Sequence, residues 1–147
     1  KEKRLNEILL FSINNPGNLR PVGTSTGYNQ YGTMEEGVMG LAKDLRYKEL
    51  HRHLDTIAKI IPMFAPPNEN DTKSYIADVV KRSGFGANQH LDLMDSTTMG
   101  RLMAAIVRHE SPKASKKLPP EVIIRILNET GGNATVQSSM NANSWVQ

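Results

Sequence analysis

The stretch from Gly100 to Ser115 reads G-R-L-M-A-A-I-V-R-H-E-S-P-K-A-S, and the fold is organised around it. Apolar residues recur here at the spacing of one helical face. They are Met99, Leu102, Met103, Ile106 and Val107. Glu110 follows Ile106 by four residues and so continues this apolar stripe, while Pro112 disfavours any further helix. The stretch therefore predicts an amphipathic helix that carries Glu110 in its last turn.

The position of Glu110 disfavours the ionised form of its carboxyl group for two reasons. Partial burial removes water from the charge, and the negative end of the helix dipole repels it. A carboxylic acid that stays protonated near neutral pH can act as the general acid in cleavage of a glycosidic bond. The alternative is a solvated glutamate at a helix end, paired with Arg108 or His109.

Length and composition indicate one ordinary globular domain. The chain has 147 residues, of which 38% are hydrophobic and 22% are charged, with a net charge of +3 and no cysteine. The absence of cysteine excludes disulfides and cysteine-based metal sites. No apolar run approaches the roughly 20 residues of a membrane span, and no basic run is interleaved with aromatics. We therefore expect neither a membrane span nor a nucleic-acid partner.

Periodicity and capping signals predict an all-α domain over residues 1–130. The expected helices cover residues 1–11, 33–47, 54–63, 71–83, 96–110 and 121–127. The helix that ends at Glu110 is expected at the centre, against the helices at 33–47 and 71–83. The Asn-, Ser- and Gly-rich residues 131–147 predict an extended or disordered tail.

Details of the 33–47 helix and of the histidines after it refine this prediction. Thr33 and Glu36 match a capping box, T-x-x-E. Gly37 and Gly40 each cost about 1 kcal/mol relative to alanine inside a helix, so they predict a closely packed neighbour. His51 and His53 are two residues apart and lack a third ligand, so we expect surface residues, and no metal or other cofactor.

Polar residues before residue 33 are candidates for a sugar-binding wall. N-N-P-G-N at 14–18 must form a turn, and its amides can both donate and accept hydrogen bonds, as saccharide hydroxyl groups require. The alternative is a plain loop. The candidates are Asn14, Asn15, Asn18, Arg20, Tyr28, Gln30 and Tyr31.

The central stretch also resembles the catalytic helix of the lytic transglycosylases, within the lysozyme-like superfamily. That family has an apolar helix that ends in Glu-Ser and is followed by a second serine, here Glu110, Ser111 and Ser115. Gly27 to Thr33 resembles the family's G-L-M-Q segment at Gly27 and Gln30. The resemblance implies that Glu110 is the catalytic acid and that Ser111 contacts substrate.

A third segment, Asp71 to Val79, resembles the family's E-T-x-x-Y-V-x-x-V helix. Thr72, Tyr75 and Val79 match, and Asp71 replaces the glutamate, so the resemblance implies that Tyr75 lies at the substrate. In the family the glutamate helix comes first, whereas here it comes last. This order is what circular permutation would produce, and it predicts that Asn15, Gln30 and Tyr75 reach the Glu110 carboxyl group.

The run from Asn14 to Glu110 is similar to lysozyme-like domains of tailed-bacteriophage virion proteins. The shared cues are N-N-P-G-N, A-P-P-x-E-N-D-T and A-I-x-R-H-E. This resemblance implies a peptidoglycan-cleaving domain in a phage particle that contacts other virion or tail proteins and acts at the host cell wall or periplasm. The alternative is a structural virion component that keeps the fold without catalysis. A small helical nucleic-acid binder is a third reading, based only on the basic charge.

The type of cleavage depends on a second carboxylate. Hydrolysis with retention or inversion needs a second carboxylate at about 5 Å or about 6.5–9.5 Å from the acid. The acids considered in the matched segments are Glu36, Glu69 and Asp71, and none matches a second-carboxylate motif. The resemblance instead implies a transglycosylase in which Glu110 serves as acid and then as base.

Overall fold

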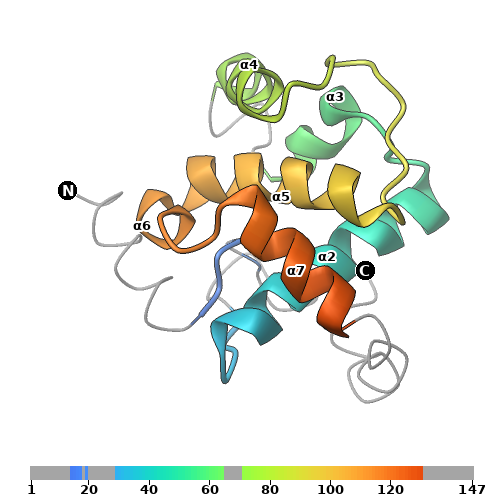
Figure 1. The fold of residues 1–147 in the computed structure, drawn as a ribbon. Coiled ribbons are helices and arrows are strands. Elements are labelled where there is room, and N and C mark those ends of the chain that lie inside the picture. The colour runs from blue at the N-terminus through green and yellow to red at the C-terminus, as the bar shows by residue number, and fades with distance from the viewer. Residues whose placement is uncertain (1–13, 18, 20–28, 65–70, 131–147) are drawn as a thin grey trace.

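A computed structural model of the chain describes residues 14–17, 19, 29–64 and 71–130 (Figure 1). Every regular element in these ranges is helical, which confirms the predicted all-α class. The elements are α2 (Met34–Arg52), α3 (Ile57–Ile60), the 3-10 helix η1 (Ile61–Met63), α4 (Thr72–Ser83), α5 (Ser96–Glu110), α6 (Pro112–Ser115) and α7 (Pro120–Thr130). The helix expected at 1–11 and the tail expected at 131–147 lie outside the described residues.

Side-chain caps determine where three of these helices begin. Thr33, Asp71 and Asp95 precede α2, α4 and α5, and each accepts a hydrogen bond from a backbone N–H in the first helical turn. The predicted capping box is half formed. The Glu36 carboxylate accepts from the backbone N–H of Gly32 at 3.4 Å, one residue before the Thr33 cap.

Two helix bounds differ from the sequence prediction. α2 continues to Arg52, five residues beyond the predicted end, and stops at His53 in the left-handed region with φ 56°. α3 begins at Ile57 rather than at residue 54, because the Thr56 side chain caps it by accepting from the backbone N–H of Lys59. A strong local cap therefore overrides the apolar periodicity that predicted the earlier start.

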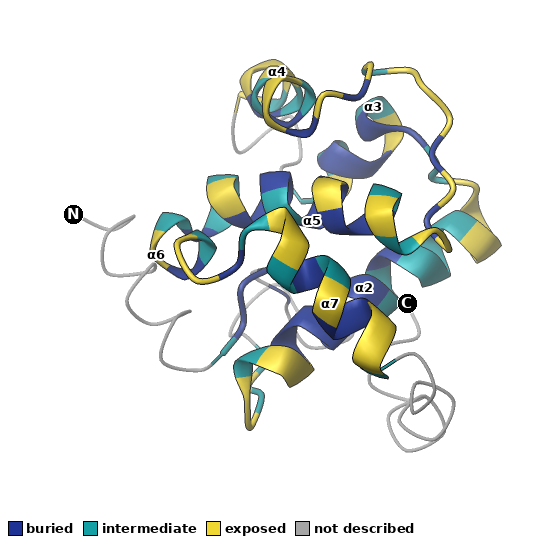
Figure 2. Ribbon diagram, viewed as in Figure 1, coloured by how far each residue is buried: buried dark blue, intermediate teal, exposed yellow. Residues whose placement is uncertain are grey.

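The core is built around α5, which lies across the middle of the molecule (Figures 1 and 2). The predicted apolar stripe is confirmed, since all five of its residues are buried. They are Met99, Leu102, Met103, Ile106 and Val107. The predicted partners are correct only in part: α5 packs most extensively against α7 and α4, and only lightly against α2.

Gly100 explains why α7 approaches α5 so closely. A Cβ atom at this position would lie 2.4 Å from Cγ1 of Ile124 on α7. The absence of a side chain therefore permits the crossing. Gly100 is the feature of the sequence that could have indicated the α5–α7 contact.

Gly37 serves a similar purpose on α2. A Cβ atom there would lie 1.8 Å from the carbonyl oxygen of Asn14 and 2.9 Å from Cδ of Pro16. The close neighbour predicted from this glycine is confirmed: it is the turn at 14–17, in which Asn14 has a φ of 57°. The described part of this turn, residues 14–17, is therefore packed onto α2.

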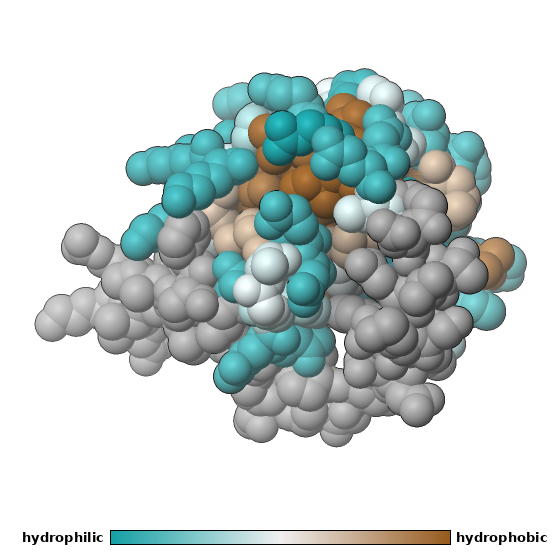
Figure 3. Space-filling view, turned by 60° about the horizontal axis from the view of Figure 1, so that its bottom comes forward, coloured by the Kyte–Doolittle hydropathy of each residue, from teal (hydrophilic) through white to brown (hydrophobic). Residues whose placement is uncertain are grey.

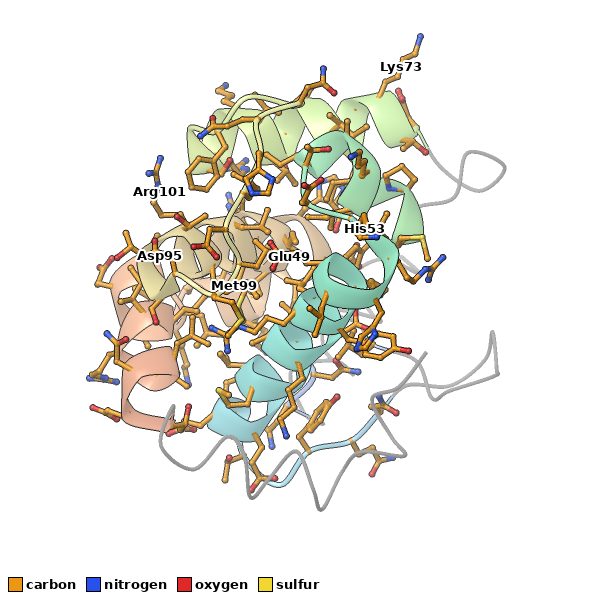
Figure 4. The ribbon with its side chains drawn as sticks, turned by 90° about the vertical axis from the view of Figure 1, so that its right-hand side faces the viewer. Glu49, His53, Lys73, Asp95, Met99 and Arg101 are labelled. Atoms are coloured by element: carbon orange, nitrogen blue, oxygen red, sulfur yellow. The ribbon has the colours of Figure 1, made fainter. Side chains whose placement is uncertain are left out.

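The loop before α5 is tied to α2 by two hydrogen bonds. The backbone N–H of Leu93 donates to the Glu49 carboxylate at 3.2 Å, and Nε of Arg46 donates to the carbonyl oxygen of Leu93 at 3.0 Å. Figure 4 views this end of the molecule and labels Glu49 and the α5 cap, Asp95. These contacts hold the loop that leads into α5 against α2.

The surface combines hydrophilic and apolar areas. Figure 3 shows apolar atoms gathered at the centre of one face and framed by hydrophilic side chains. Among the described residues, the large apolar side chains with high exposure are Leu50, Met63 and Met94. Singly exposed apolar residues are normal on folded proteins, so these three give no argument for a partner.

Candidate functional site

Glu110 is the last residue of α5 and is half-buried. The phenol of Tyr75, a buried residue of α4, donates a hydrogen bond to the Glu110 carboxylate with an O–O distance of 2.6 Å. The expected approach of these two residues, 35 positions apart in the chain, is confirmed as a contact. A role in binding substrate stays a prediction for Tyr75.

Burial and the neighbouring carboxyl group raise the pKa of Tyr75, a phenol that is protonated at physiological pH even at its ordinary pKa. Burial first, and then the negative charge of Glu110 and their hydrogen bond, raise the pKa of Tyr75 far above its ordinary value of 10.0. The phenol therefore stays protonated across the physiological pH range. It can therefore donate a hydrogen bond to the Glu110 carboxyl group throughout that range.

His109 contacts the Tyr75 member of this pair. Its imidazole ring stacks on the Tyr75 ring, with centroids 3.6 Å apart and planes inclined by 20°. Nδ1 of His109 lies 3.0 Å from Oδ2 of Asp78, and Nε of Arg82 donates to Oδ1 of the same carboxylate at 2.8 Å. We call the five residues Glu110, Tyr75, His109, Asp78 and Arg82 the Glu110 cluster.

The Asp78 carboxylate is ionised in this arrangement. Burial alone would raise its pKa, but the hydrogen bonds from His109 and Arg82, together with the positive charge of Arg82, outweigh that effect. The pKa of Asp78 therefore lies below its ordinary value. Both of its oxygen atoms are engaged, one by each partner.

Ser111 follows Glu110 and has no exposed surface, which corrects the substrate contact expected for it, because a side chain without accessible surface cannot meet a ligand. Its hydroxyl oxygen has no hydrogen-bond partner among the described residues. A buried hydroxyl group without a hydrogen-bond partner is uncommon and lowers the folding stability by about 1–3 kcal/mol. The second serine of the motif, Ser115, donates to the carbonyl oxygen of Pro112 at 2.8 Å and thereby stabilises α6.

Four of the candidate sugar-binding residues lie in the described part of the chain, namely Asn14, Asn15, Gln30 and Tyr31. Asn15 has no exposed surface, and its amide donates to the carbonyl oxygens of Leu19 (2.8 Å) and Asn29 (3.0 Å) and accepts from the Leu19 N–H. This corrects the sugar contact and the approach to Glu110 that were expected for Asn15, because a side chain without accessible surface cannot meet a ligand. It braces the turn instead.

The other described candidates for sugar binding differ in their contacts and exposure. The Asn14 amide donates to the carbonyl oxygen of Tyr31 at 3.1 Å, and burial raises the pKa of Tyr31. Gln30 is exposed. The described contacts within the Glu110 cluster are between α4 and α5, and the expected meeting of Gln30 and Glu110 stays a prediction. Asn18, Arg20 and Tyr28 lie outside the described residues.

Sequence reasoning missed Asp78 and the role of His109. Asp78 follows Tyr75 by three residues and precedes Arg82 by four, and residues at these spacings share a helix face. That pattern could have placed an acid beside Tyr75. The sequence also allowed His109 to pair with Glu110. In the structure His109 pairs with Asp78 instead.

Neither a metal-binding cluster nor a membrane-spanning helix is present among the described residues. No group of three or more His, Asp or Glu side chains there could hold a metal ion. No helix in the same part of the chain is long and apolar enough to cross a membrane.

The fold and the cluster together define a small all-α domain with a tyrosine-bound glutamate at the end of its central helix. No family model matches the chain. Over 65 residues it is 34% identical to Protein P5 of Pseudoalteromonas phage PM2. The match covers 44% of this chain and 41% of that protein. The chain is therefore similar, over part of its length, to a bacteriophage protein.

Proposed function

We propose that this chain is a peptidoglycan-cleaving domain of a bacteriophage virion, and that Glu110 is its catalytic acid. The observation that carries the proposal is the hydrogen bond from Tyr75 to Glu110. It orients a half-buried carboxyl group at a helix end, and a fixed orientation is what proton transfer to a bound sugar requires. Similarity to a phage protein supports the placement in a phage.

The arrangement favours a mechanism with one acid. Asp78 was overlooked as a second carboxylate in the sequence, but its two oxygens are engaged by His109 and Arg82. In the proposed reaction Glu110 protonates the glycosidic oxygen as the bond to the anomeric carbon breaks. The Glu110 carboxylate then takes the proton of the sugar's own 6-hydroxyl group, whose oxygen attacks the anomeric carbon and closes a 1,6-anhydro ring.

The test compares Glu110→Gln with the wild-type chain on purified peptidoglycan. The amide has the same shape but cannot donate an acidic proton, so release of soluble fragments is expected to stop while circular dichroism and the melting temperature stay close to wild type. Glu121→Gln, an exposed residue of α7, is the matched control and is expected to retain full activity.

Mass spectrometry of the released muropeptides identifies the chemistry. Anhydro-muramic ends are expected from the wild-type chain. Reducing ends in their place would refute the transglycosylase assignment, and full activity of Glu110→Gln would remove Glu110 from the mechanism.

The alternative is a structural virion component without catalysis. The same Tyr75–Glu110 bond favours it in one respect, since a buried phenol between two packed helices needs a partner in any protein. This reading predicts a wild-type chain that clears no peptidoglycan in a zymogram. In that case Glu110→Gln would change stability alone.

The place of action follows from the proposed substrate. A virion protein that cleaves glycan strands would act at the host cell wall or in the periplasm, where it would open the wall for genome delivery. Neighbouring virion or tail proteins would be its other partners.

A further inference from the structure

We propose that His109 and Asp78 are positioning residues, which hold Tyr75 and, through it, the Glu110 carboxyl group in the orientation that cleavage requires. The inference rests on the proposed function, in which Glu110 is the catalytic acid. It assigns a purpose to two polar residues to which the matched motifs gave no role.

The first step of the argument is the contact between His109 and Tyr75. The two rings are stacked, with centroids 3.6 Å apart. A phenol can rotate about its Cβ–Cγ bond and swing about its Cα–Cβ bond, and a ring lying flat on one face limits both motions. The imidazole therefore restricts the direction in which the Tyr75 hydroxyl group points, and this hydroxyl group is the atom bonded to Glu110.

The second step is the anchor of His109 itself. Its Nδ1 atom is bonded to Asp78, which lies on the same helix as Tyr75 and three residues after it. Arg82, one turn further, holds the second oxygen of that carboxylate. α4 thus contacts the end of α5 twice, through Tyr75 at Glu110 and through Asp78 at His109. These two contacts leave the end of α5 little freedom to rotate against α4.

The chain offers a matched pair for comparison. Nδ1 of His90 lies 2.7 Å from Oδ2 of Asp55, a geometry close to that of His109 and Asp78. The His90 side chain is 72% exposed, whereas that of His109 is 31% exposed. His90 precedes α5, and Glu110 ends it, so variants of the first pair test the effect of losing a histidine–aspartate contact away from the site.

The experiment uses variants that separate the two contacts of His109. His109→Phe keeps a ring against Tyr75 but cannot pair with Asp78, and His109→Asn keeps an N–H donor but removes the ring. Asp78→Asn removes the charge of the anchor. The controls are His90→Phe and Asp55→Asn. Each chain is assayed on purified peptidoglycan for kcat and KM, and its melting temperature is recorded.

The expected result is a loss of kcat on the order of 10-fold or more in each site variant, with KM changed little, because misplacement of a catalytic group affects the chemical step. Asp78→Asn should add little loss in a His109→Phe background, since both changes break the same contact. The control variants should keep the wild-type kcat.

Two outcomes of the assay would overturn the inference. Site variants with the wild-type kcat would show that the cluster has no positioning role. A fall in kcat that follows the melting temperature equally in site and control variants would show a structural role only. A wild-type chain that releases no fragments overturns the proposed function, and the orientation of Tyr75 by His109 and Asp78 is then tested separately by NMR.

A proton NMR signal distinguishes this last case further. The Tyr75 hydroxyl proton, short-bonded to Glu110, should shift in His109→Phe and Asp78→Asn even if the chain cleaves nothing. An unchanged signal in both variants would show that neither residue orients the phenol.

Discussion

At the scale of single residues, the polar side chains at the end of α5 make contacts with α4 that the sequence did not predict in full. Tyr75 donates to Glu110 and stacks on His109, and Asp78 binds His109. The apolar spacing and Pro112 were enough to predict that Glu110 ends a helix. The partners of His109 could not be predicted, because they depend on how α4 is rotated about its axis against α5.

The lowered pKa of Asp78 predicts a pH-dependent contribution to stability. A carboxyl group whose pKa is lower in the folded than in the unfolded chain stabilises the fold above the unfolded pKa, which is about 4. This contribution disappears as the pH falls through the lower folded value. Asp78→Asn should therefore lower the melting temperature at pH 7, and the difference from wild type should shrink below about pH 4. A melting-temperature difference that stays constant from pH 7 to pH 3 would contradict this.

At the scale of helices, caps and close approaches explain most of the agreement with the sequence. The sequence offers Asn70 or Asp71 as the cap of α4 and Asp95 or Ser96 as the cap of α5, and the aspartate is the cap in both helices. Such signals are local, so one chain suffices to find them. The extension of α2 to Arg52 was not predictable from its apolar residues, because its last turns are held by polar contacts to a distant loop, among them Glu49 to Leu93.

The close crossing of α5 and α7 predicts that a larger residue at Gly100 destabilises the fold and that a smaller residue at Ile124 compensates. Alanine would favour the helix by about 1 kcal/mol, but its Cβ would lie 2.4 Å from Ile124. Overpacking of this kind costs roughly 1–3 kcal/mol, so Gly100→Ala should lower the free energy of unfolding measured in urea. Adding Ile124→Ala should recover part of that loss. If the two losses simply add, the crossing is not limited by this contact.

At the scale of the whole molecule, the all-α class and the central position of α5 were predictable, and the arrangement around α5 was not. Composition, the absence of β alternation and one long apolar stripe indicate a helical domain with α5 buried. Which helices cover α5 depends on shape. α7 was expected only as a last helix available for packing, yet it is the principal neighbour.

The central position of α5 can be tested at Ile106, which has no exposed surface. Truncation to alanine in a packed core costs roughly 2–5 kcal/mol, and Ile106→Ala is expected to lower the free energy of unfolding by that amount. Thr97→Ala, at an exposed position of the same helix, serves as the control and should change it by less than about 0.5 kcal/mol. A cost near zero at Ile106 would mean that the buried face is wrongly identified.

The contact between Gly37 and the turn at 14–17 has a consequence for how the two segments evolve. The turn at 14–17 occupies the space that any side chain at position 37 would fill. Neither feature can change alone without a clash or an empty space, so the two are expected to be inherited as one unit. A descendant sequence with a larger residue at position 37 should also have a different turn, and a search that requires both features together should find distant relatives better than a search for either one.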